Sequence, residues 1–222
     1  MKYEIFHRPS YAMLKLNLPD AESVIAEAGA MVAMNTAMTI KTHARGGVLK
    51  SMSRSLLGGE SFFVNTFTSN GDGELVLAPR LPGDIIAREL NGQTLFVQSG
   101  SFIAATPDVE IDTKWGGTKG FFSTKNFFLL RCSGNGTIFL SSYGAIEEVT
   151  LAAGQRYVVD TAHTVAFDES VQYAIKSSGK IKTLLFSGEG LICEYTGPGQ
   201  IYYQSRDITA LANIIGPMVA QK

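Results

Sequence analysis

Short runs of hydrophobic residues, each bounded by glycine, asparagine or proline, recur along the whole chain. Two examples are the runs at 74–77 and 137–140, which lie between glycine-containing segments. Short apolar runs flanked by turn residues are typical of β-strands, whereas amphipathic helices need longer stretches with a period of about 3.6 residues. The pattern therefore predicts an all-β fold.

The C-terminal segment 207–219 has a different pattern, which predicts a short helix. Asp207 is a suitable N-cap, because its carboxylate can accept hydrogen bonds from the first free N–H groups of a helix. Apolar residues at helical spacing follow it: Ile208, Leu211, Ala212 and Ile215. We expect Gly216 and Pro217 to end or bend this helix.

One sequence motif occurs three times, at 26–33, 97–104 and 159–166. Each copy contains an acid or amide at its second position and an apolar residue followed by alanine at its end. Internal similarity of this kind is the signature of a repeat architecture.

A second motif, Gly-x-Gly followed by an apolar run and then Gly-x-Ile, also occurs three times, starting at Gly71, Gly134 and Gly188. We expect the Gly-x-Gly elements to form tight hairpin turns, since glycine readily adopts positive φ. The two motifs together predict a single β domain over 1–222. Its three pseudo-symmetric repeats, at about 14–86, 87–148 and 149–206, are expected to pack around a common axis and so hide most strand edges.

The chain resembles the "altered inheritance of mitochondria" family of small β proteins over about residues 3–215. The resemblance lies mostly in glycine turns and apolar positions, at 58–63, 77–79, 82–85, 120–123, 187–190, 197–199 and 204–206. It implies a fold like that of the tryptophan RNA-binding attenuation protein, a short variant of the double-stranded β-helix. It also implies homo-oligomers, and a link of the eukaryotic members to mitochondrial biogenesis without an established enzymatic activity.

Composition excludes several classes of protein. With 45% hydrophobic and 18% charged residues, the 222-residue chain is neither disordered nor a coiled coil. The formal net charge of −1 argues against a globally basic nucleic-acid binder. Residues 1–10 lack the apolar core of a signal peptide, and no stretch is long enough to span a membrane, so we expect a cytoplasmic protein.

Catalytic and metal-binding motifs are absent from the sequence. The two cysteines, Cys132 and Cys193, are far apart and read as buried thiols. A cupin-like metal enzyme would require His7, His43 and His163 to converge, although none lies close to another in sequence. We therefore expect a protein that is not an enzyme, with no cofactor and no metal.

Glu27, Gln98 and Asp160 occupy the same position in the three copies of the first motif. They could form a polar ring or an ion site near a threefold axis. Alternatively, each could cap its own turn, which we favour because the middle residue is an uncharged amide and a metal site would prefer a carboxylate.

Two segments could meet an anionic partner. Segment 41–54 carries four cations and no acid, and segment 114–125 mixes cations with aromatic residues on a glycine-rich loop. Such residues suit phosphate groups and stacked bases or a membrane interface, but they also suit a solvated loop whose aromatics pack on the barrel end. The candidate residues are Lys41, Arg45, Lys50, Arg54, Lys114, Trp115, Lys119 and Phe121.

The sequence thus predicts a non-enzymatic scaffold or binding protein that acts as a homo-oligomer, with a trimer or a multiple of it favoured. Exposed β edges and the apolar C-terminal segment would supply the interface. The alternative is an RNA-binding or anionic-lipid-binding protein that uses the two basic segments.

Overall fold

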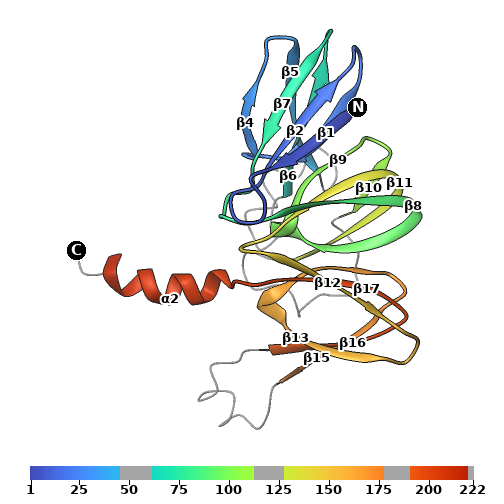
Figure 1. Ribbon diagram of the computed structural model, residues 1–222, viewed down its shortest axis with the longest axis vertical. Coiled ribbons are helices and arrows are strands. Elements are labelled where there is room, and N and C mark those ends of the chain that lie inside the picture. The colour runs from blue at the N-terminus through green and yellow to red at the C-terminus, as the bar shows by residue number, and fades with distance from the viewer. Residues whose placement is uncertain (46–61, 113–127, 178–190, 220–222) are drawn as a thin grey trace.

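The structure, a computed structural model, describes residues 1–45, 62–112, 128–177 and 191–219. Antiparallel β-strands make up most of this part of the chain, and one helix follows them at the C-terminus. The prediction of an all-β fold with a short C-terminal helix is confirmed. Figure 1 shows the strands stacked in three tiers that follow the chain order, from the blue N-terminal strands at one end to the orange and red strands at the other. The first tier contains the strands within residues 2–77, the second those within 85–141 and the third those within 146–204.

A four-stranded sheet in the order β1-β2-β7-β4 forms the outer part of the first tier. Its strands are β1 (Lys2–Phe6), β2 (Met13–Leu18), β7 (Gly73–Leu77) and β4 (Met31–Met34). Strand β2 alternates as expected for one buried face: Leu14 and Leu16 are buried, while Lys15 between them is half-exposed. The alternation fixes the register, because a shift of one residue would expose the leucines.

A ten-stranded sheet connects all three tiers. Nine strands follow the order β12-β17-β14-β8-β11-β9-β3-β6-β5, and β10 pairs with β11 beside that path. These strands are β3 (Ser23–Glu27), β5 (Met38–Arg45), β6 (Phe62–Ser69), β8 (Ile85–Gln98), β9 (Phe102–Ala105), β10 (Val109–Asp112), β11 (Leu129–Ser141), β12 (Ile146–Leu151), β14 (Thr164–Asp168) and β17 (Gly199–Gln204).

The last tier is completed by a three-stranded sheet in the order β13-β16-β15. It consists of β13 (Arg156–Asp160), β16 (Leu191–Thr196) and β15 (Gln172–Ser177).

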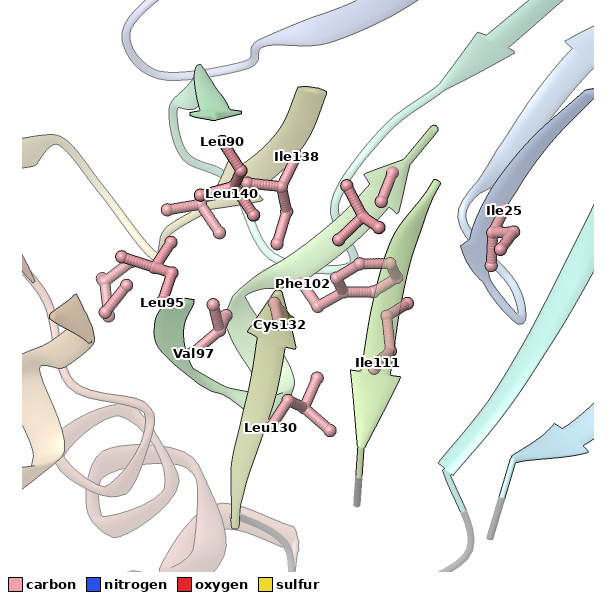
Figure 2. Close-up of a cluster of buried hydrophobic side chains, with 14 of the residues drawn as sticks. Ile25, Leu90, Leu95, Val97, Phe102, Ile111, Leu130, Cys132, Ile138 and Leu140 are labelled. Atoms are coloured by element: carbon pink, nitrogen blue, oxygen red, sulfur yellow. The ribbon is translucent and has the colours of Figure 1, made fainter. Parts of the chain in front are cut away.

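Buried hydrophobic side chains form three clusters, one for each tier. The first cluster includes Leu14, Leu75 and Ile103, the second includes Ile25 and Phe102, and the third includes Phe96 and Phe167. Figure 2 shows the second cluster, where Phe102 lies among side chains from β8, β10 and β11.

Neighbouring tiers exchange side chains between these clusters. Ile25, on a strand of the first tier, lies in the second cluster, and Ile103, on a strand of the second tier, lies in the first. The tiers therefore do not have independent cores.

Four segments far apart in sequence lie side by side where one tier passes to the next. We call this set, residues 12, 82–84, 142–145 and 205–206, the junction row. Ala12 N–H donates to the carbonyl of Gly83 (2.9 Å), Asp84 N–H to Gly144 (2.9 Å), and the N–H at residue 205 to Ala145 (3.0 Å). Pairing of Gly83 with Gly144 is parallel.

A partly buried ion pair fixes one end of the junction row. The Nε and Nη2 atoms of Arg8 donate to the two carboxylate oxygens of Asp84, at 2.7 and 2.9 Å. The Asp84 side chain is 4% exposed, and it also accepts a hydrogen bond from Ile85 N–H (2.8 Å). The bidentate geometry ties the loop after β1 to the start of β8.

The prediction that Gly-x-Gly elements form hairpin turns is wrong for both copies that the structure describes. Residues 71–73 connect β6 of the large sheet to β7 of the small sheet, and these two strands do not pair with each other. Residues 134–136 lie inside β11, at a break in its register with β8. Gly134 (φ 127°) and Gly136 (φ 157°) have the positive φ values typical of such an irregularity. Strand β10 pairs with β11 before Asn135 and β9 pairs with it after Gly136, while β8 pairs with both parts. The third copy, 188–190, is outside the described residues.

The helix α2 (Ile208–Val219) begins as predicted. The two carboxylate oxygens of Asp207 accept hydrogen bonds from Thr209 N–H (2.8 Å) and Ala210 N–H (3.0 Å), which is an N-cap. Pro217 lies inside the helix instead of ending it, since the helix continues to Val219. None of its residues is buried, and in Figure 1 it projects away from the strands.

We expect Gly83→Ala to destabilise the fold, because the new Cβ would overlap the main-chain carbonyl of Ser142 in the junction row. Backbone cannot move aside as a flexible side chain can, so the loss is about 2–3 kcal/mol of unfolding free energy. Urea unfolding followed by circular dichroism measures it. Gly216→Ala is the control, since nothing lies within 4 Å of a Cβ there. Equal stability of the two variants would contradict this account of the junction row.

Candidate functional site

The structure describes little of the predicted anion-binding surface. Lys41 is exposed on β5, and Arg45 is the last residue of that strand. The other candidates lie outside the described residues: Lys50, Arg54, Lys114, Trp115, Lys119 and Phe121. An RNA or lipid partner for these segments therefore stays a prediction.

The two cysteines are buried in the interior. Burial raises the pKa of the Cys132 thiol to about 12 and that of the Cys193 thiol to about 11. Because the thiolate is the reactive form, both side chains remain inert thiols at neutral pH.

His163 has a structural role. Its Nδ1 lies 2.6 Å from the carbonyl oxygen of Gln204, so this nitrogen carries the proton and donates it to the carbonyl. Within the described ranges, no group of three or more His, Cys, Asp or Glu side chains is placed to hold a metal ion.

A polar cluster lies across β8, β12, β14 and β17. The Gln200 side chain donates to Glu148 (2.6 Å) and accepts from the Tyr202 hydroxyl (3.0 Å), while its main-chain N–H donates to Asp168 (2.8 Å). Asp168 also lies 3.8 Å from the guanidinium of Arg88. Burial raises the pKa of Tyr202 to about 12, against the opposing effect of Arg88, so the phenol stays neutral. The groups around Gln200 are paired with one another and hold these strands together, whereas the buried Arg88 Nε has no hydrogen-bond partner among the described residues.

One of the three residues at the second position of the first motif caps its own turn: Asp160 Oδ1 accepts from Ala162 N–H (2.8 Å). Gln98 precedes the equivalent turn but makes no side-chain hydrogen bond to its main chain, and its Oε1 accepts instead from the hydroxyl of Ser101 (3.3 Å). The turn-capping interpretation is confirmed at Asp160 and is wrong at Gln98.

Glu27, which occupies this position in the first motif copy, has a different environment. Burial raises the pKa of its carboxyl group to about 7, although Arg80, 3.3 Å away, opposes that rise. Arg80 Nη2 also donates to the carbonyl of Ala28 (2.7 Å), so its charge is shared with the turn. Burial thus keeps the Glu27 carboxyl group partly protonated at neutral pH.

The large hydrophobic side chains that the structure leaves exposed gather mainly in two kinds of place. One is the helix α2, with Ile214, Ile215, Met218 and Val219. The other is a pair of strands at sheet edges, with Met31, Val32 and Met34 on β4 and Val158 on β13. Exposed apolar groups that gather in this way are typical of interaction surfaces.

We expect Glu27→Gln to stabilise the protein at pH 8 by about 2 kcal/mol, because a buried carboxylate whose folded pKa is raised must ionise there at a cost. The stability that wild-type Glu27 contributes is complete below pH 4.5 and is lost as the pH rises through about 7. Urea unfolding from pH 4 to 8 measures both curves. Glu74→Gln, which removes an exposed carboxylate paired with Lys15, is the control. If the unfolding free energy of Glu27→Gln depends on pH as that of the wild type does, the raised pKa is not that of Glu27.

Comparison with known proteins agrees with this architecture. Residues 3–206 match the family model described as mitochondrial biogenesis AIM24. An uncharacterised protein of Streptococcus pyogenes serotype M6 is 29% identical over 223 aligned positions, which cover 97% of this chain and 90% of that protein. The crystal structure of a Streptococcus pyogenes protein superposes with a TM-score of 0.81 at 28% identity, over 98% of this chain and 99% of that one. The chain therefore belongs to the mitochondrial biogenesis AIM24 family.

Proposed function

We propose that this protein is a non-enzymatic scaffold or binding protein that acts as a homo-oligomer. The observation that carries the proposal is the helix α2, whose sequence contains no charged residue and whose apolar side chains are exposed. A short helix of this kind is marginal in water unless its apolar face is covered, so a partner surface would stabilise it.

The rest of the described chain supports the same proposal. Its cysteines are inert, His163 is held by a main-chain carbonyl, and the polar side chains around Gln200 are paired with one another. Exposed hydrophobic groups lie on α2 and on the edge strands β4 and β13, which are surfaces suited to contacts with protein. The described residues contain no helix that is long and apolar enough to cross a membrane. The expected cytoplasmic location stays a prediction.

We expect the full chain to sediment as a multiple of its 23.9 kDa monomer at about 10 μM, a concentration at which a specific interface is populated. Sedimentation velocity and light scattering measure the mass. The mass of a monomer at this concentration would refute the proposal.

The contribution of α2 is tested by Ile214→Glu/Met218→Glu, which places two charges one helical turn apart on the exposed apolar face. Neither side chain is buried, so the strands should fold normally while the apparent association constant falls at least about tenfold. Thr209→Glu/Asn213→Glu adds the same charges at polar positions of the same helix and should associate as the wild type does. If both variants keep the wild-type mass, α2 does not form the interface, although the oligomer itself would stand.

A further inference from the structure

Strands that carry the first motif pair across the tier boundaries in the same way at both boundaries. Between the first and second tiers, β9 pairs antiparallel with β3, with Ala104 opposite Ala26. Between the second and third tiers, β14 pairs antiparallel with β8, with Ala166 opposite Val97. In both pairs, the last residue of one motif copy lies opposite the first residue of the preceding copy.

The same pattern leaves one strand unmatched at each end of the chain. Strand β4 ends the first motif copy, and its only partner among the described strands is β7. Strand β13 begins the last motif copy, and within the described ranges it pairs with β16 alone. Among the described strands, each of these two therefore has one edge of main-chain N–H and C=O groups without a strand partner, where its counterparts have a second partner.

Val158 on β13 and Val32 on β4 are more exposed than their counterparts in the other motif copies. Val158 immediately precedes the third motif copy and is 52% exposed, whereas Ile25 and Phe96, which precede the other copies, are each 4% exposed. These two counterparts are buried because each lies in the hydrophobic cluster of the following tier. Among the described residues, no tier follows the one that contains Val158.

The opposite end of the chain has the complementary deficiency. Val32, at the seventh motif position, is 53% exposed, whereas its counterparts Ile103 and Val165 are 1% and 0% exposed. Ile103 lies in the cluster of the first tier and Val165 in that of the second, in each case the tier before its own. In the part of the chain that the structure describes, no tier precedes the one that contains Val32.

We propose that β4 of one copy of this protein pairs antiparallel with β13 of a second copy, and so repeats between chains the pairing that joins the tiers within one chain. The register follows from the two internal pairs, in which Ala105 lies opposite Ile25 and Phe167 opposite Phe96. The equivalent positions place Met34 of one copy opposite Val158 of the next. This inference rests on the proposed homo-oligomer and adds a strand contact between copies to the α2 surface already named.

A second copy fits these edges better than an unrelated peptide does. Both edges belong to the same chain, so each copy offers the strand that the other lacks, and the internal pairs already define a matching geometry. Strand β4 carries no charge, and the charged residues of β13, Arg156 and Asp160, lie at its two ends, so no like charges oppose each other across the middle of the pair. The contact is head-to-tail, which closes into a ring or extends as a stack.

Single-cysteine variants test this pairing directly. Met34→Cys and Val158→Cys replace exposed side chains, and the native Cys132 and Cys193 are buried and unreactive. The two variants are co-expressed with different tags and treated with a short bis-methanethiosulfonate, which forms a disulfide with each thiol and releases sulfinate, because side chains directly opposite in a β pair have Cβ atoms about 5 Å apart. We expect a cross-linked heterodimer in the mixture and no dimer from either variant alone.

Two controls accompany this experiment. Lys2→Cys combined with Val158→Cys places the first thiol on β1, at the opposite edge of the same sheet, and should give no product. Separately, Val158→Lys should weaken self-association at least about tenfold, whereas Ile40→Lys, at a similarly exposed apolar position on β5, should leave it unchanged.

The outcomes separate the two proposals. Cross-linking of either single variant with itself would indicate a symmetric contact and overturn the head-to-tail pairing. An oligomeric full chain that gives no heterodimer would overturn the β4–β13 contact but leave the proposed homo-oligomer intact. A full chain that is monomeric at every concentration would overturn both.

Discussion

The structure depends on main-chain hydrogen bonds between chain segments that are far apart in sequence. At the junction row, residues 12, 82–84, 142–145 and 205–206 satisfy one another's N–H and C=O groups as they pass between tiers. Such groups are costly to bury without partners, so the crossings are possible only where the segments lie together. The space between Gly83 and Ser142 leaves no room for a side chain, and the Arg8–Asp84 pair holds the outer end of the row.

Much of this fold could be predicted from the sequence, because the relevant signals are local. Short apolar runs between turn residues indicate strands, and Asp207 indicates the start of α2. The paths of the strands could not be predicted in the same way. A Gly-x-Gly element allows either a hairpin or a bend within a strand, and the choice at 134–136 is made by β10 and β9, which pair with the two parts of β11, and by β8, which pairs with both. The similarity to a fold like that of the tryptophan RNA-binding attenuation protein stays a prediction.

The candidate surface was less accessible to sequence reasoning. Charge distinguishes the two basic segments in the sequence, and of their candidate residues Lys41 alone has a described side chain. Exposure of Val32 and Val158 could not be read from the sequence, because their counterparts in the other motif copies are equally apolar and yet are buried. The difference arises from position in the stack of tiers. The one signal available in the sequence was the order of the motif copies, since Val32 lies in the first copy and Val158 immediately precedes the third.

The junction row has an evolutionary consequence. Since the segments at which the chain enters and leaves each tier lie next to one another, a whole tier could be lost or duplicated with little change in the path of the remaining backbone. Gene length in such a lineage would change in steps of one tier more readily than by small insertions at the crossings. The geometry that holds the molecule together therefore makes the whole tier the unit of change, and an added tier would have to supply the side chains that its neighbours' clusters take from it.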